Sequence, residues 1–165
     1  SACYCAVGST GASLCAGSDP CDPAAGSIGA GSCIGYNTCA NSGGSIGAGS
    51  CNGYYACYDT GGSIGASSCN DSSACFYAAG SIGTGSCVGN ASCVFSVGPI
   101  GAGSCTGVHA CYYAAGSIGT SSCNTSGPAC RGGLGNSFPI GDCQHNDVAP
   151  AACLIPRVML PIVTR

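Results

Sequence analysis

The stretch IGAGSCNGYYACYDTGGS, residues 46–63, contains the pattern that decides the fold. It divides into three hexads, Ile46–Cys51, Asn52–Cys57 and Tyr58–Ser63, and the first two end in cysteine. Cysteines that end the first hexad recur every 18 residues along the chain, at Cys15, Cys33, Cys51, Cys69, Cys87, Cys105 and Cys123. A fixed period kept over this length is the signature of a tandem-repeat protein.

Other columns of the repeat keep the same period. A second cysteine follows the first by six residues in each unit except the last, where Gly127-Pro128 adds one residue. An isoleucine followed by glycine opens the first hexad, at Ile28, Ile46, Ile64, Ile82, Ile100 and Ile118. The fifth position of that hexad is always serine, from Ser32 to Ser122. The second and third hexads also carry small residues at this position.

This pattern of an aliphatic residue, a glycine and a small fifth residue resembles the hexapeptide repeat of β-helix proteins. The resemblance covers about residues 10–136 and implies an all-β fold, a disulfide-rich β-solenoid (β-helix) of about seven 18-residue coils. We therefore expect an N-terminal segment, 1–9, the solenoid, 10–136, and a C-terminal cap or tail, 137–165. Frequent glycine disfavours a helix, and collagen is excluded because glycine does not recur at every third position. A bundle of polyproline-II segments stays open as the alternative.

The cysteine content indicates an oxidising compartment. The chain has 18 cysteines in 165 residues, an even number, which predicts a disulfide framework and a secreted, extracellular or cell-surface protein. A chain that opens on Ser1 rather than Met is the form expected of a mature secreted protein. Zinc sites favour shorter spacings between paired cysteines, so we expect no bound metal.

The spacing restricts how the cysteines pair. Residues six apart lie too far apart for a disulfide in a regular triangular coil, but they can meet across a flattened one. Small insect antifreeze solenoids also carry cysteine pairs six apart, and this chain is similar to them in that feature. Pairing between stacked coils, ~4.8 Å apart, stays open, although seven cysteines in one column cannot all pair in this way. We expect one bridge within each coil, and the expected pairs are Cys15–Cys21, Cys33–Cys39, Cys51–Cys57, Cys69–Cys75, Cys87–Cys93, Cys105–Cys111 and Cys123–Cys130, with Cys143–Cys153 beyond them. Cys3 and Cys5 are expected at a terminal or intermolecular bond.

Several function classes find little support in this sequence. Three arginines and no lysine leave no cationic surface for nucleic acid, and no apolar run reaches the ~18 residues that a membrane span needs. The only histidines are His109 and His145, and His109 occupies a variable position of the repeat. We therefore expect neither an enzyme nor a cofactor site. The N-x-S/T pattern marks Asn70, Asn90 and Asn124 as candidate glycosylation sites.

Aromatic residues gather in two neighbouring columns of the third hexad. Tyr58, Phe76 and Tyr112 form one column, and Tyr77, Phe95 and Tyr113 flank it. Because adjacent residues of an extended chain point to opposite sides, we expect an exposed aromatic stripe. A corner that turned both columns inward would remove it.

Two functions fit these observations. The first is an extracellular structural protein, a stiff disulfide-stapled rod that associates with copies of itself into a fibre or surface layer. Low charge favours such association, and the apolar tail Leu154–Thr164 could dock on a neighbouring copy or fold back over its own last coil. The second is an ice-binding (antifreeze) protein, whose partner would be an ice surface. Its flat face would include the column Ala30, Ala48, Ala66, Thr84, Ala102 and Thr120.

Overall fold

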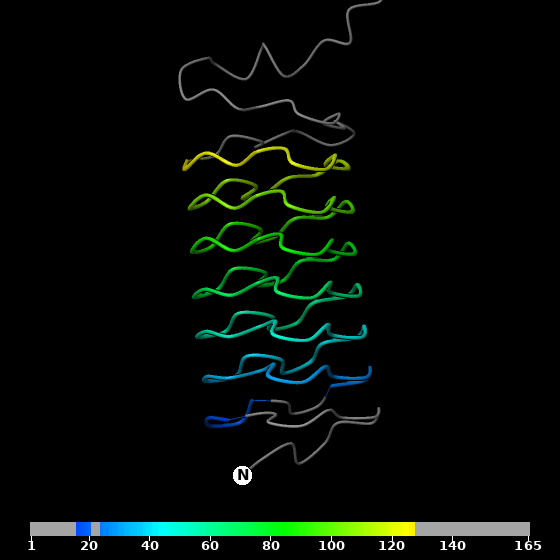
Figure 1. Ribbon diagram of the computed structural model, residues 1–165, viewed down its shortest axis with the longest axis vertical. Helices are drawn as coiled ribbons and strands as arrows, with labels where there is room; N and C mark the ends of the chain where they lie inside the picture. The colour runs from blue at the N-terminus through cyan, green and yellow to red at the C-terminus, as the bar shows by residue number, and fades with distance from the viewer. Residues whose placement is uncertain (1–15, 21–23, 128–165) are drawn as a thin grey trace, which may run out of the picture.

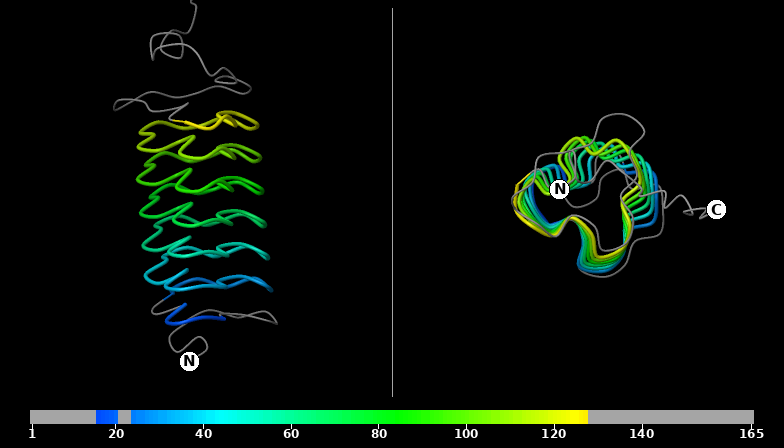
Figure 2. Two further views of the ribbon diagram at one scale, coloured as in Figure 1. Left: turned by 90° about the vertical axis from the view of Figure 1, so that its left-hand side faces the viewer. Right: turned by 90° about the horizontal axis from the view of Figure 1, so that it is seen from above.

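The structure is a stack of similar coils that follow one another along a single axis. It is a computed structural model, and the residues it describes are 16–20 and 24–127. Figure 1 shows the coils one above another from residue 24 to residue 127. Seen along the axis, the described coils superimpose on one outline with a marked indentation (Figure 2). The 18-residue sequence period is therefore one turn of the stack.

Regular secondary structure in the described residues is sparse. They contain no helix, and the paired β-structure takes the form of isolated parallel bridges between isoleucines one coil apart, Ile28–Ile46, Ile46–Ile64, Ile64–Ile82, Ile82–Ile100 and Ile100–Ile118. The fold is thus a disulfide-rich repeat whose described coils carry isolated bridged residues, the isoleucines and Ala24, rather than runs of extended strand.

Backbone hydrogen bonds nevertheless join each coil to both neighbours. The Ile64 N–H donates to Ser45 O at 2.8 Å in the preceding coil, and the Gly65 N–H donates to Ile82 O at 2.7 Å in the following coil. Equivalent bonds recur around the coil, for example from the Cys75 N–H to Ala56 O at 2.8 Å. Because the same bonds repeat at each turn, the register between coils is fixed by the backbone as well as by side chains.

Left-handed residues turn the chain within each coil. Cys51, Tyr55 and Asp59 have φ values of 59°, 53° and 56°, and the residues in these columns of the other described coils have similar positive values. Such a conformation costs a non-glycine residue roughly 1–2 kcal/mol. It persists here because the coils above and below hydrogen-bond to the same segments.

The interior is filled by small side chains and cystines. Isoleucine, alanine and cysteine columns are buried, and so is the serine at the fifth position of the first hexad. That serine links successive coils, since the Ser68 hydroxyl donates to Gly83 O at 2.8 Å and accepts the Ser86 N–H at 3.2 Å. The small fifth residue of the repeat is therefore a buried hydrogen-bonding group and not only a space-saving one.

Glycine is required where two coils approach each other closely. A Cβ atom at Gly65 would lie 2.5 Å from Thr84 N and 2.7 Å from Gly83 C in the next coil. These neighbours are backbone atoms, which cannot turn aside as a side chain can. The glycine after each isoleucine thus sets the distance between coils.

Some of the sequence predictions fall outside the described residues. These concern the segments 1–9 and 137–165, the tail Leu154–Thr164, His145, and the cysteines Cys3, Cys5, Cys15, Cys21, Cys130, Cys143 and Cys153.

Candidate functional site

The cystines form a column through the centre of the stack. The structure contains the within-coil pairs Cys33–Cys39, Cys51–Cys57, Cys69–Cys75, Cys87–Cys93 and Cys105–Cys111. Their Cα–Cα distances are 5.4–5.7 Å, the ordinary range for a disulfide, so residues six apart meet within each of these coils. Cys123 is also disulfide-bonded.

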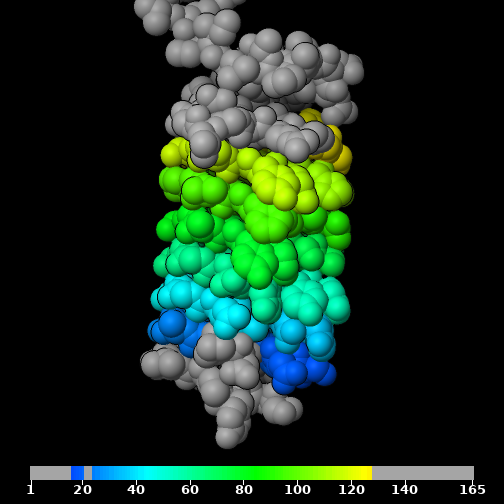
Figure 3. All heavy atoms as spheres, turned by 180° about the vertical axis from the view of Figure 1, so that it is seen from behind, coloured from blue at the N-terminus to red at the C-terminus, as the bar shows by residue number. Residues whose placement is uncertain are grey.

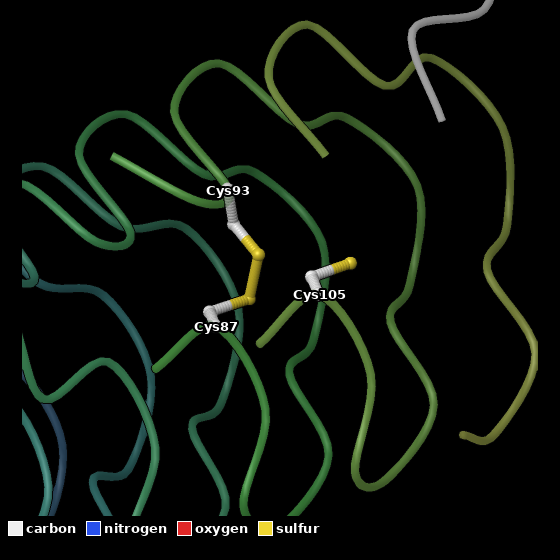
Figure 4. Close-up of side chains that lie close together, drawn as sticks. All are labelled: Cys87, Cys93 and Cys105. Carbon is white, nitrogen blue, oxygen red and sulfur yellow. A yellow bond between two sulfur atoms is a disulfide. The ribbon is translucent and has the colours of Figure 1, made fainter. Parts of the chain in front are cut away.

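Sulfur atoms of successive coils approach one another closely in this column. The sulfurs of Cys87, Cys93 and Cys105 all lie within 4.8 Å of one another, and Figure 4 shows the Cys105 sulfur beside the Cys87–Cys93 bond. A soft metal ion binds thiolates, whereas these three sulfurs are committed to disulfides. The disulfides therefore form a buried column in which each bond fixes the shape of its own coil.

Aromatic side chains cover one face of the rod. Figure 3 shows ring side chains following one another along the axis on this face. Tyr77 and Tyr113 are 40% and 45% exposed, whereas their neighbours Phe76 and Tyr112 are half-buried. One of each adjacent pair is thus the more exposed, and the exposed aromatic stripe that the sequence predicts is present. These pairs lie in turns rather than in extended chain, since Tyr77 and Tyr113 have φ values of 55° and 58°.

The structure adds a further pair of tyrosines that the sequence analysis missed. Tyr36 and Tyr54 are 41% and 55% exposed, and their rings stack with centroids 5.2 Å apart and planes 13° apart. Both belong to the third position of the second hexad. That position changes to serine, asparagine and valine in later coils, at Ser72, Asn90 and Val108, so it does not form a conspicuous aromatic column. The sequence signal that could have identified this pair is that the two tyrosines are separated by 18 residues, one period of the repeat.

The rings form one connected series of contacts along the axis. Tyr54 meets Tyr55 edge-on at 4.5 Å, and Tyr55 meets Tyr58 at 5.3 Å. Tyr58 then contacts Tyr77 at 5.8 Å, and the parallel stack of Tyr77, Phe95 and Tyr113 follows with spacings of 5.5 and 5.0 Å. In these stacks the ring faces cover one another, so the surface presents ring edges and hydroxyl groups.

The local environment of the Tyr54 phenol disfavours its ionisation. Its pKa is raised above the ordinary 10.0, first by desolvation among its neighbours, then by repulsion from Tyr55, by the hydrogen bond with the Tyr55 hydroxyl, and by repulsion from Tyr36. Successive tyrosines are thus packed closely enough to disfavour charge on one of them.

His109 lies on the surface, as its variable column predicts. Its ring is exposed and meets Tyr112 edge-on at 5.5 Å, so it extends the aromatic face.

The three candidate glycosylation sites differ in their surroundings. The Asn70 amide donates to Gly49 O at 2.8 Å and its Oδ1 accepts the Asn52 N–H at 3.2 Å. Asn124 repeats this arrangement with Gly103 and Thr106, so both asparagines hold neighbouring coils together. Asn90 belongs instead to the column of Tyr36 and Tyr54, and its side chain is half-buried, unlike those exposed tyrosines.

Small residues form two regular columns beside the isoleucine bridges. Ser45 and Ala48 point outward on either side of buried Ile46, and the coils above and below repeat this arrangement. The column that contains Ala48 also includes Thr84 and Thr120, both exposed. This strip is separate from the aromatic columns in sequence and carries no formal charge.

Comparison with known proteins places the chain in a family. The profile described as Domain of unknown function (DUF7640) matches residues 1–110 and again residues 72–154. The chain belongs to the DUF7640 family. The two matches overlap, as expected when one repeating pattern fits a profile in more than one register. No curated protein and no solved structure matches the chain.

Among the described residues of this DUF7640 protein, no helix has the length and apolar character needed to cross a membrane.

Proposed function

We propose that this protein is an extracellular structural protein, a disulfide-stapled β-solenoid rod that associates with copies of itself into a fibre or surface layer. The observation that carries the proposal is the stack of coils, in which hydrogen bonds of the same register run along the axis and a buried cystine closes each of five coils. A particle built in this way resists bending, because a bend must separate backbone bonds on one side. Assignment to the β-solenoids rests on the parallel isoleucine bridges.

The composition of the surface supports association with like copies. Within the described residues, 16–20 and 24–127, the only formally charged side chains are Asp19, Asp59 and Asp71. Two such rods therefore meet little repulsion, because a net charge far from zero is what keeps proteins apart. The exposed tyrosines supply the aromatic surface that protein interfaces favour. Buried cystines agree with secretion, since disulfides persist in oxidising compartments.

The described residues offer few side chains that could act in catalysis. The one described histidine is an exposed member of the aromatic face, and the described carboxylates, Asp19, Asp59 and Asp71, are also exposed. We therefore propose a non-enzymatic role without a cofactor, and without nucleic acid as a partner.

Electron microscopy and sedimentation of the full chain under oxidising conditions test the proposal. We expect filaments or sheets whose assembly is blocked by Val108→Lys, which places a charge in the exposed column of Tyr36 and Tyr54. Thr84→Lys adds the same charge in the small-residue strip and serves as the matched control, with assembly retained. A wild-type protein that stays monomeric at high concentration would contradict the proposal.

Ice binding is the second candidate, and the small-residue strip is the observation that favours it. Its outward columns repeat in register from coil to coil, which supplies a flat, periodic face. Alanine holds most of its outer positions, with hydroxyl-bearing threonine at Thr84 and Thr120. Thermal hysteresis that is present in the wild type and lost in Thr84→Lys would favour this function over the structural one.

A further inference from the structure

We propose that the stacked pair Tyr36–Tyr54 is a site of oxidative cross-linking, at which a peroxidase with hydrogen peroxide joins the two rings as dityrosine. The bond would connect two successive coils of one chain. It is independent of self-association, since both rings belong to the same molecule.

The pair combines access with proximity. Both side chains are about half exposed, so an oxidant can reach either phenol. The rings are stacked, with planes within 13° of parallel and centroids 5.2 Å apart, so the two phenols are close neighbours. The coils hold the two residues in this arrangement through the bond from the Tyr55 N–H to Tyr36 O at 2.9 Å.

The chemistry of the step is balanced by one molecule of peroxide. Each phenol gives up one electron and its hydroxyl proton, which leaves a phenoxyl radical with spin density on the carbons beside the C–O carbon. Two such carbons form a carbon–carbon bond, and each then loses its hydrogen as a proton to restore the aromatic ring, while the oxygens recover protons. Hydrogen peroxide takes up the two electrons and two protons and becomes two molecules of water. The chain loses two hydrogen atoms.

The neighbouring rings favour this pair as the place where radicals combine. Tyr54 is in contact with Tyr55, and contacts continue through Tyr58 to Tyr77. A radical formed at another of these tyrosines can therefore reach the pair by exchange between adjacent phenols. In the second stack Phe95 separates Tyr77 from Tyr113, and a phenyl ring without a hydroxyl group does not form a phenoxyl radical.

The cross-link would complement the disulfides. The five described disulfides each close a loop within one coil, so none of them ties one coil to the next. A bond between Tyr36 and Tyr54 would join coils covalently and hold that part of the stack together when its backbone bonds open.

The experiment treats the full-length protein, dilute enough to be monomeric, with horseradish peroxidase and hydrogen peroxide. The products are reduced, alkylated, digested with pepsin and mapped by mass spectrometry, and dityrosine fluorescence is followed in parallel. We expect a cross-linked peptide pair containing Tyr36 and Tyr54, with the mass of two hydrogens missing and a yield that does not fall on dilution. Tyr36→Phe and Tyr54→Phe keep the ring and should each lose this product.

Two further variants make the test specific. Tyr77→Phe removes an exposed tyrosine whose stacked partner is Phe95, and it should retain the product. Phe95→Tyr supplies the missing phenol and should gain a second intramolecular cross-link, to Tyr77 or Tyr113. Thermal unfolding and circular dichroism verify that each variant folds. The proposal is overturned if the folded wild type forms only cross-links between molecules, or if Tyr54→Phe leaves the Tyr36 cross-link yield unchanged.

Discussion

Replacing Ser68 by alanine tests whether the buried serine column joins the coils. Ser68 is fully buried, its hydroxyl donates to Gly83 O at 2.8 Å, and it accepts the Ser86 N–H at 3.2 Å. Alanine fits the same space but leaves both backbone groups of the next coil without this partner. An unsatisfied buried group costs about 1–3 kcal/mol. The Ser86 N–H is buried, whereas the bond to Gly83 O is only partly buried, so we expect a loss of about 1–3 kcal/mol in the free energy of unfolding.

The assay is guanidinium unfolding with the disulfides intact, followed by near-ultraviolet circular dichroism of the tyrosines. Ser81→Ala is the matched control, because Ser81 is exposed and such a substitution changes stability by no more than about 0.5 kcal/mol. The reasoning is refuted if the two variants unfold at the same guanidinium concentration. That result would mean that the serine is conserved along the repeat for its size alone.

Three other perturbations probe separate features. Gly65→Ala places a Cβ against backbone atoms of the next coil and should strongly destabilise the protein. Gly85→Ser should be tolerated, because Gly85 has open space around it and serine already occupies the same column at Ser67 and Ser121, with φ values of 54° and 53°. Thermal unfolding temperatures of the two variants test this difference. The described cystines are 0% exposed, so native protein should react with dithiothreitol far more slowly than protein in guanidinium, and equal rates of thiol release would show that the column is open to solvent. The raised pKa of Tyr54 means that the fold favours its neutral phenol, so this contribution to stability is present below pH 10 and is lost as the pH rises through the folded-state pKa. Subtracting the ultraviolet titration curve of Tyr54→Phe from that of the wild type should give a transition with its midpoint above pH 10.0. A midpoint below that pH would contradict the packing of the tyrosines.

The repeat and its core could be predicted from the sequence because each depends on one strongly patterned column. The isoleucines at 18-residue spacing are the aliphatic residues of the hexapeptide resemblance, and Ile46, Ile64 and Ile82 are bridged and buried. The cysteine spacing left two pairings open. The structure has the within-coil pairs, and the Cα atoms of Cys51 and Cys57 lie 5.4 Å apart.

The backbone conformation of the corners could not be predicted in the same way. Left-handed residues are usually glycine or asparagine, whereas here Cys69, Tyr77 and Phe95 adopt φ values of 56°, 55° and 55°. These values follow from bonds to neighbouring coils, which no local sequence pattern encodes. The same corners limit the β-structure of the described residues to isolated bridged residues, where the hexapeptide resemblance implied an all-β solenoid.

Of the candidate site, the aromatic stripe could be predicted from the sequence, whereas the stacked pair Tyr36–Tyr54 could not. Aromatic residues adjacent in sequence at Phe76-Tyr77 and Tyr112-Tyr113 indicated a stripe, and Tyr77 and Tyr113 are its exposed members. They lie in left-handed turns and not in the extended chain on which that prediction rested. Tyr36 and Tyr54 belong to a column of mixed composition, and their stacking depends on the register between coils. Contacts of this kind appear only when the stacking is known.

The register between coils is the central claim, and scalar couplings across hydrogen bonds measure it most directly. A long-range HNCO experiment on the labelled full-length protein detects which carbonyl carbon accepts each amide proton. The structure predicts correlations from the Gly47 amide to the Ile64 carbonyl, from Gly65 to Ile82 and from Gly83 to Ile100. Correlations that link these amides to carbonyls at any other separation would contradict a stack with one coil for every 18 residues.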